Sequence, residues 1–238
     1  MTKLKYLDDT YLYESVANFL EIREDDFGKA VILDSTIFYP QGGGQPTDAG
    51  KIISDNASFL VKKVMLDKDG TVFHFGEFEK GSFNKNETVK LKIDKEKRIS
   101  HAKLHSAAHL IDCAVESIGL YKQLTPEKGF QFPAGPYVEY EGTLENPPEY
   151  VNKITKKVNE LVAQDIKILS ETISHEEAKK QGVSVPAGKP ARLVSFEKFR
   201  KVGCGGTHVN SSSEIGKIII RKIKLKKGKT KIAYALET

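Results

Sequence analysis

The chain has 238 residues, of which 39% are hydrophobic and 29% are charged, and its formal net charge is +5. This composition excludes a disordered chain, and the length allows one large hydrophobic core or two smaller ones, of which we favour two. No apolar run approaches the ~20 residues that span a bilayer, the N-terminus lacks an apolar secretory segment, and two distant cysteines give no disulfide framework. We therefore expect a cytoplasmic protein with no membrane partner; its oligomeric state is not predictable from sequence.

The first region of the chain, 1–95, has the pattern of short strands separated by turns. Strand patterns occupy 30–33, 59–66, 71–75 and 88–93. Turn signals such as Asp69-Gly70 and Lys80-Gly81 separate them. The pattern predicts a small antiparallel β-barrel domain over 1–95.

A glycine-rich segment, FYPQGGGQPTDAG, occupies 38–50 of this region. Consecutive glycines let a backbone approach a ligand or another chain closely. The segment lacks the Gly-Lys-Ser/Thr ending of a nucleotide P-loop, which excludes that function. Taken alone, it is typical of a mobile turn.

A helix is predicted over 99–118, after the charged run 94–98, and it carries His105 and His109. Residues four apart on a helix lie on one face. A zinc protease places a glutamate base between two such histidines, but 106–108 are Ser-Ala-Ala, which disfavours peptide hydrolysis and suits a more activated ester. Cys113 is eight residues from His105, ~12 Å along a helix, so we expect a buried core residue rather than a third ligand.

The second region, 96–238, mixes helical and strand patterns. An amphipathic helix begins at Pro147-Pro148, and a short helix capped by Ser174 and Glu177 ends near Gly182. Strand patterns lie at 137–140, 166–169, 192–196, 215–226 and 230–236. We expect a two-layer α/β domain with helices on a largely antiparallel sheet, which gives an α+β fold class for the whole chain.

A second metal-ligand pair, Cys204 and His208, lies in the sequence CGGTH. Imidazole and thiolate are ligands that Zn²⁺ prefers, so the two pairs together predict one tetrahedral zinc site. Two alternatives stay open at this point. The four residues can be core histidines with a stray thiol, or they can hold a purely structural zinc, which also uses four protein ligands.

The C-terminal stretch from Lys217 to Lys231 contains eight Lys or Arg residues and no acidic residue. Its alternation predicts a hairpin that places Ile219, Ile223 and Leu225 on one face with Arg221. Lys222, Lys224 and Lys226 follow Ile218 and Ile220 on the other face. The lysines can protect an edge strand from aggregation or contact nucleic-acid phosphates; we favour the second interpretation slightly.

These motifs, FYPQGGGQPTDAG, HSAAH and CGGTH followed by Glu214-Ile215-Gly216, occur in an order that closely resembles the editing region of alanyl-tRNA synthetase. No aminoacylation core is present, so the chain resembles a free-standing alanyl-tRNA editing protein of the AlaX family, medium-length type. The editing domain of threonyl-tRNA synthetase shares the two ligand pairs but lacks the glycine-rich segment, and is a weaker match. The resemblance implies hydrolysis chiefly of Ser-tRNA(Ala), at a zinc bound by His105, His109, Cys204 and His208. Whether Gly-tRNA(Ala) is also a substrate is not predictable from the sequence.

We assign further roles as hypotheses that rest on this resemblance. Thr207 and the amides of Gly205 and Gly206 are candidates for contacting the ester or its oxyanion. The candidates for substrate binding are Gln45, Thr47, Gly43 and Gly44 on the glycine-rich segment, and Lys222, Lys224, Lys226 and Lys229 for the tRNA backbone.

One departure concerns the segment after the zinc helix, where alanyl-tRNA synthetases tend to carry Gln-Lys-Gly and this chain has Glu127-Lys128-Gly129. Discrimination of serine from alanine at this position is therefore open. Two other functions also remain open. One is a non-catalytic RNA-binding protein with a structural zinc, and the other is a zinc hydrolase of a different activated ester.

Overall fold

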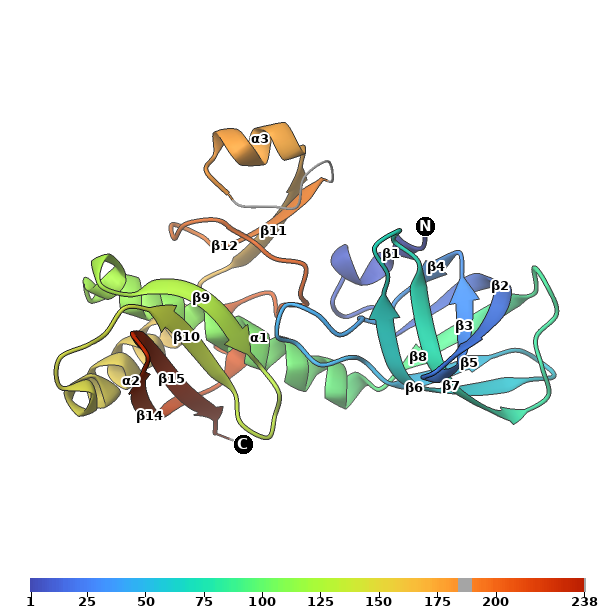
Figure 1. The fold of residues 1–238 in the computed structure, drawn as a ribbon, viewed down its shortest axis with the longest axis horizontal. Helices are drawn as coiled ribbons and strands as arrows, with labels where there is room; N and C mark the ends of the chain where they lie inside the picture. Colours follow the sequence, from blue (N-terminus) through green and yellow to red (C-terminus); the bar gives the residue numbers. More distant parts are fainter. Residues whose placement is uncertain (184–189, 238) are drawn as a thin grey trace. The chain divides into compact units, whose positions relative to one another are not determined.

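The structure, a computed structural model, describes residues 1–183 and 190–237 and contains two compact units, Met1–His101 and Ala102–Thr238 (Figure 1). The predicted α+β class is confirmed, because an antiparallel barrel is followed by helices and antiparallel sheets. The domain boundary predicted at 95/96 falls at the start of helix α1 (Lys95–Ser117) and remains a prediction. Among the helices of the described residues, none has the length and apolar character needed to cross a membrane.

Six antiparallel strands of the first unit close into a barrel in the order β2-β3-β7-β6-β5-β8. Their bounds are Glu14–Asp25 (β2), Gly28–Leu33 (β3), Gly50–Ile53 (β5), Ser58–Leu66 (β6), Val72–Lys80 (β7) and Thr88–Ile93 (β8). A short parallel pair, β1 (Lys3–Leu4) with β4 (Ser35–Thr36), and the 3-10 turn η1 (Lys5–Leu7) complete the unit.

The barrel core follows from strict alternation along the strands. In β8, Val89, Leu91 and Ile93 are buried while the residues between them are exposed, which is the period of two expected for a strand with one buried face. Where β7 pairs with β6, Gly76 leaves no room for a side chain, since a Cβ there would lie 1.8 Å from the Leu60 carbonyl oxygen.

Strand β2 was not predicted from sequence, and its side chains show why. Val16, Leu20 and Ile22 are exposed apolar residues of this strand, and the register shifts between Phe19 and Glu21. Exposed apolar residues and a bulge both remove the alternation that identifies a half-buried strand.

His74 of β7 is a fully buried polar side chain inside the barrel. Its Nδ1 lies 2.9 Å from the Val31 carbonyl oxygen and its Nε2 lies 2.7 Å from the Thr36 hydroxyl. Because a carbonyl only accepts, Nδ1 carries the hydrogen and Nε2 accepts from Thr36. Burial lowers the pKa of His74 to about 4, so the imidazole is neutral in the folded barrel.

Acid is expected to destabilise the barrel through His74. The unfolded imidazole titrates near its ordinary pKa of 6.5 and the folded one near 4, so the unfolded chain takes up the proton first as the pH falls. The contribution of neutral His74 to the free energy of unfolding is fully present above pH 6.5 and is lost between about pH 6.5 and pH 4. It amounts to about 3 kcal/mol. His74→Gln removes the titration. Unfolding of metal-free protein, followed by circular dichroism, should therefore show that lowering the pH costs the wild type more stability than the variant. A pH-independent difference between them would contradict the prediction.

The second unit contains a four-stranded sheet and a three-stranded sheet. The four-stranded order is β14-β15-β10-β9, from β14 (Ile218–Lys226), β15 (Lys229–Leu236), β10 (Tyr137–Glu141) and β9 (Thr125–Phe130). The three-stranded sheet consists of β11 (Ile168–Ile173), β12 (Ala191–Phe196) and β13 (Val202–Gly203). The remaining elements are α2 (Pro147–Ala163), α3 (His175–Lys180), η2 (Leu120–Lys122) and η3 (Ser212–Ile215). All strands within each sheet pair antiparallel, as predicted.

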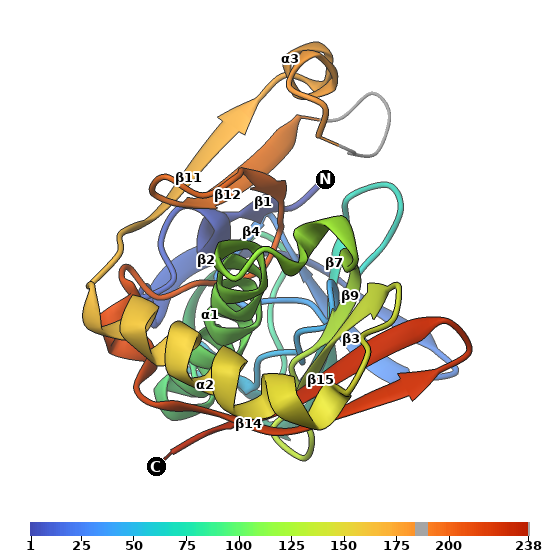
Figure 2. The same ribbon diagram turned by 90° about the vertical axis from the view of Figure 1, so that its left-hand side faces the viewer.

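Helix α1 is central in this unit, and both views show it between the two sheets (Figures 1 and 2). It is rich in small buried side chains, such as Ala107, Ala108 and Ala114, which allow close packing in one core with α2 and the sheet. The Tyr234 hydroxyl of β15 donates to the Leu104 carbonyl at 2.8 Å and so ties the helix to the sheet. Cys113 is buried in this core, as predicted.

The hairpin β14–β15 forms as predicted, but the assignment of its faces was wrong before Arg221. Ile218 and Ile220 are buried, and Ile223 then takes the next inward position. The register shift between Ile220 and Lys222 makes Arg221 a bulge residue, and one inserted residue exchanges the two faces of a strand.

Candidate metal centre

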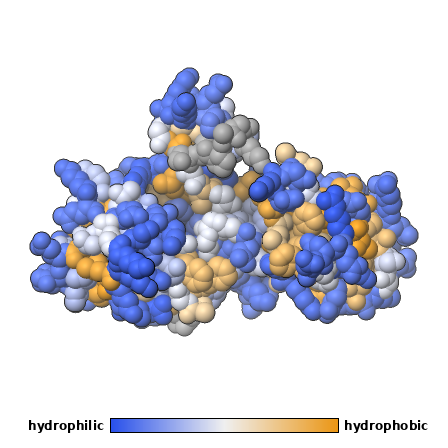
Figure 3. Space-filling model, in the orientation of Figure 1, coloured by the Kyte–Doolittle hydropathy of each residue, from blue (hydrophilic) through white to orange (hydrophobic). Residues whose placement is uncertain are grey.

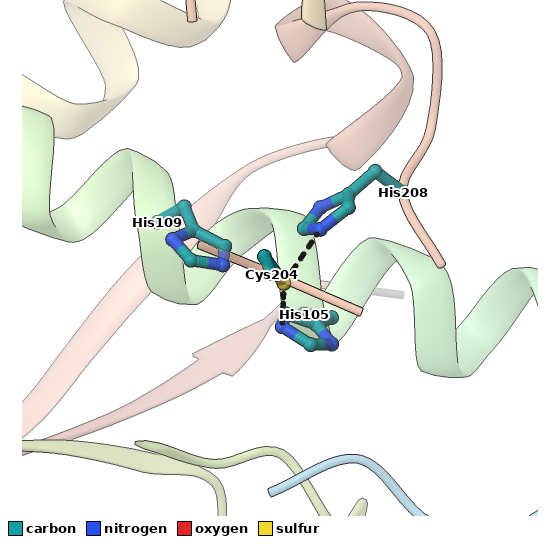
Figure 4. A group of neighbouring side chains, drawn as sticks. All are labelled: His105, His109, Cys204 and His208. Atoms are coloured by element: carbon teal, nitrogen blue, oxygen red, sulfur yellow. Dashed lines mark hydrogen bonds between the residues drawn. The ribbon is translucent and has the colours of Figure 1, made fainter. Parts of the chain in front are cut away.

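Helix α1 supplies two of the predicted ligands, His105 and His109. Their rings are nearly parallel, with centroids 5.2 Å apart and planes 11° from each other, because one helical turn separates them. Figure 4 shows both rings directed toward the same point, where Cys204 and His208 also lie.

Cys204 and His208 lie in the segment that follows β13, and Arg192 of β12 holds this segment in place. Arg192 Nη1 donates to the carbonyls of Cys204 and Gly206, each at 3.0 Å. The Cys204 amide donates to the Arg192 carbonyl at 2.9 Å. One arginine thus fixes the backbone on both sides of Gly205.

The structure brings the four predicted ligands together. Cys204 Sγ lies 3.4 Å from His105 Nε2 and 3.3 Å from His208 Nε2. The four ligand atoms all lie within 4.8 Å of one another. Tetrahedral zinc with bonds of ~2.0–2.3 Å needs ligand atoms roughly 3.3–3.8 Å apart, so the three nitrogens and one sulfur suit this ion in chemistry and nearly in spacing.

The protonation of the cluster also fits a metal site. Burial lowers the pKa of His109 to about 4, and burial together with the neighbouring imidazoles lowers the pKa values of His105 and His208 well below 6.5. All three rings are therefore neutral, and a neutral imidazole has one nitrogen lone pair that can bind a metal. Burial raises the pKa of the Cys204 thiol, so an ion that stabilises the thiolate would complete the site.

The three candidate catalytic residues lie between two ligands, in Gly205-Gly206-Thr207. Thr207 is fully buried and Gly205 is exposed. The Gly206 amide lies 3.4 Å from Cys204 Sγ and donates to it. Of the two candidate amides, the one at Gly206 is thus directed at a ligand atom.

The glycine-rich segment belongs to the first unit, where its own contacts hold it. Gly43 and Gly44 have φ of 53° and 84°, which side chains disfavour, and they form a tight turn between Gly42 and Gln45. The Thr47 hydroxyl donates to the Tyr39 carbonyl at 3.3 Å and accepts from the Val64 amide at 2.8 Å.

Gln45 is fully buried. Burial and hydrogen bonds thus hold Gln45 and Thr47 in fixed positions within the loop. Their contact with substrate stays a prediction.

A buried ion pair beneath this loop was not identified from sequence. Asp48 and Arg98 both have side chains that are about 0% exposed, and they form a salt bridge. Asp48 also accepts from the Tyr39 amide at 2.7 Å, and Arg98 donates to the carbonyls of Thr10 and Ile37. The one available signal was Asp48 itself, an acidic residue inside an otherwise uncharged glycine-rich motif.

Three of the candidate tRNA-contacting lysines lie on β14 of the second unit, and the fourth, Lys229, begins β15. Lys222, Lys224 and Lys226 are exposed, and Figure 3 shows hydrophilic residues along this hairpin. Lys229 differs from them, because it forms ion pairs with Glu127 at 2.5 Å and with Glu141 at 3.0 Å. Glu127, the departure from the synthetase pattern, thus neutralises the fourth candidate lysine.

Comparison with known proteins gives matches to alanine–tRNA ligases and to an alanyl-tRNA editing protein. The family model of class II (A) tRNA synthetases matches residues 9–97. The alanyl-tRNA editing protein AlaX-L of Pyrococcus horikoshii is 30% identical over 98% of this chain and 58% of its own length. Two alanine–tRNA ligases, from Lachnoclostridium phytofermentans and Fusobacterium nucleatum, are each 35% identical over 78% and 85% of this chain.

The chain spans little more than half of AlaX-L, and only 21% and 24% of the two ligases. The AlaX-L match nonetheless extends over both units of this chain, and so over the barrel as well as the His₃Cys cluster. The chain is a homologue of the AlaX-L editing protein and belongs to the family that AlaX-L forms with the editing region of class II alanyl-tRNA synthetases.

Proposed function

We propose that this protein is a zinc-dependent hydrolase that removes serine, and also glycine, from mischarged tRNA(Ala) in trans. The observation that carries the proposal is the convergence of His105, His109, Cys204 and His208 in a homologue of AlaX-L. The reaction adds water across the ester between the amino acid and the terminal ribose, and it releases a free amino acid and an intact tRNA.

The four ligands would hold the ion, and a bound zinc supplies Lewis-acid polarisation of an ester carbonyl or of water. The other roles belong to the chain itself. Helix α1 has no carboxylate between its two histidines, so a strong general base is absent from that position. We propose that the exposed Gly205 amide donates to the developing oxyanion, with a lesser part for Gly206, and that the Thr207 hydroxyl relays a proton.

Substrate recognition is assigned to the glycine-rich loop. We propose that Gly43 and Gly44 allow the terminal adenosine to approach the backbone, while Gln45 and Thr47 contact the serine hydroxyl or that adenosine. Such a site would correct a synthetase that attaches serine to tRNA(Ala) by mistake. An alanine pocket discriminates against serine only ~10²-fold, whereas a site built to bond a hydroxyl rejects alanine because its polar groups would stay unpaired.

The direct test is deacylation of purified Ser-tRNA(Ala), Gly-tRNA(Ala) and Ala-tRNA(Ala). We expect the first two to lose their amino acid far faster than in buffer, and Ala-tRNA(Ala) to stay charged. Hydrolysis of an unrelated activated ester alone would favour a different zinc hydrolase. Tight tRNA binding without any deacylation would favour a non-catalytic protein with a structural zinc, which the four closed ligands also suit.

Neutralising the hairpin is expected to weaken tRNA binding without altering the zinc site. The variant Lys222→Gln/Lys224→Gln/Lys226→Gln removes three phosphate contacts, so the slope of log affinity against log salt should fall by about 2–3. Filter binding from 50 to 200 mM salt measures the slope. A matched variant that neutralises three exposed lysines of the first unit, Lys29, Lys80 and Lys85, serves as the control. An unchanged slope would mean that the lysines of β14, an edge strand, protect that edge instead.

A further inference from the structure

Each histidine ligand has a second ring nitrogen that does not face the centre of the cluster and needs a partner of its own. A neutral imidazole gives one nitrogen to a metal only when the other carries the hydrogen, and a neighbouring acceptor normally fixes that state. Nε2 of His208 faces Cys204 Sγ at 3.3 Å, which leaves Nδ1 on the far side of the ring. Two groups outside the cluster face such outer nitrogens.

Asp112 faces the outer side of His109. Its Oδ2 lies 4.0 Å from His109 Nδ1, and the two residues are three apart on the same face of α1. The other oxygen, Oδ1, accepts a hydrogen bond of 2.5 Å from the Tyr140 hydroxyl of β10. Tyr140 is fully buried and therefore holds the carboxylate in a fixed direction.

Ser106 faces the outer side of His208. Its Oγ lies 3.3 Å from His208 Nδ1 and accepts from the Val209 amide at 3.2 Å. Ser106 is fully buried between the two ligands that α1 carries and the segment of the other two. One lone pair of this hydroxyl is occupied by the amide, and the second is available to His208 Nδ1–H.

We propose that Asp112, held by Tyr140, is a positioning residue that keeps the hydrogen of His109 on Nδ1, and that Ser106 does the same for His208. A carboxylate can only accept, so when Asp112 Oδ2 closes from 4.0 Å to hydrogen-bond distance of His109 Nδ1, it admits just the form of His109 that presents Nε2 to a metal. This inference rests on the metal centre of the proposed function. It gives a chemical reason for two residues that the spacing of the ligands does not explain.

The test is zinc affinity, measured on metal-stripped protein by competition with a chromophoric chelator. Asp112→Asn keeps the shape and removes the obligate acceptor, so zinc should bind about 10–100-fold more weakly. Tyr140→Phe removes the hydrogen bond that orients the Asp112 carboxylate, and Ser106→Ala removes the acceptor that faces His208 Nδ1. Each change should weaken zinc binding several-fold. Asp112→Glu keeps an acceptor and should restore part of the loss.

A matched control lies on the same helix. Ser117→Ala removes a hydroxyl that bonds the Cys113 carbonyl and has no contact with a ligand, so its zinc affinity should equal that of the wild type. The melting temperature of the metal-free proteins separates positioning from packing. Positioning predicts weak zinc binding by Asp112→Asn at an unchanged metal-free melting temperature.

Two results would overturn the inference. If the wild type binds zinc and Asp112→Asn binds it within twofold, the proposed role of Asp112 is wrong while the metal centre stands. If the wild type itself binds no zinc, the metal centre of the proposed function fails and the positioning role fails with it.

Discussion

Replacement of Cys204 by serine is expected to abolish zinc binding and to slow Ser-tRNA(Ala) hydrolysis by at least about 100-fold, the equivalent of losing several kcal/mol of transition-state stabilisation. Cys204 supplies the one sulfur of the cluster, within 3.4 Å of two imidazole nitrogens. A serine hydroxyl stays protonated at neutral pH and is a poor substitute for a thiolate. Elemental analysis gives the zinc content per chain, and single-turnover deacylation gives the rate.

The chain contains its own control for this change. Cys113 is the other cysteine, and it lies in the core of the second unit rather than in the cluster. Cys113→Ala should keep full zinc content and full activity and should cost about 1 kcal/mol, as expected for a small buried group.

The affinity of Cys204→Ser for tRNA should also stay close to that of the wild type, because the proposed phosphate contacts lie on β14. A Cys204→Ser protein that hydrolyses Ser-tRNA(Ala) at the normal rate would show that the cluster is not the reaction centre. A protein that loses its helical circular dichroism on this change would instead indicate a structural metal.

The parts of the molecule that sequence could predict are those fixed by local spacing. Residues four apart on a helix share a face whatever surrounds them, so His105 and His109 could be paired before any fold was known. Strict alternation likewise identified β8, where every second residue is buried. The side-chain cap of α3 was also predictable, and Ser174 Oγ accepts from the Glu177 amide at 3.1 Å.

Other parts depend on contacts between distant residues, which local patterns do not contain. Arg98 and Asp48 are fifty residues apart, and nothing in the charged run 94–98 indicates locally that Arg98 is buried. Asp112 depends in the same way on Tyr140, which comes from another element. The bulge at Arg221 was missed because a hydrophobic run of three isoleucines fits either face of a strand.

Arg98→Met is expected to destabilise the first unit by about 3–5 kcal/mol, because removing one partner of a buried ion pair leaves an uncompensated charge. Asp48 would keep the Tyr39 amide as a donor but lose the guanidinium, and the carbonyls of Thr10 and Ile37 would lose theirs. Hydrogen exchange followed by mass spectrometry should show faster exchange in the barrel strands. The Asp48→Asn/Arg98→Met double variant should lose less than the sum of its single variants, since it leaves no unpaired charge.

An exposed ion pair on the same barrel provides the control for this prediction. Lys62 and Glu77 lie 2.8 Å apart with side chains 55% and 62% exposed, so Glu77→Gln should change stability by no more than about 1 kcal/mol. Equal effects of Arg98→Met and Glu77→Gln would contradict the role given to the buried pair. Because Asp48 also bonds the Tyr39 amide, loss of the pair should disturb the glycine-rich loop together with the barrel. Arg98→Met is thus expected to impair Ser-tRNA(Ala) hydrolysis while the zinc content, set by side chains of the other unit, stays at the wild-type value.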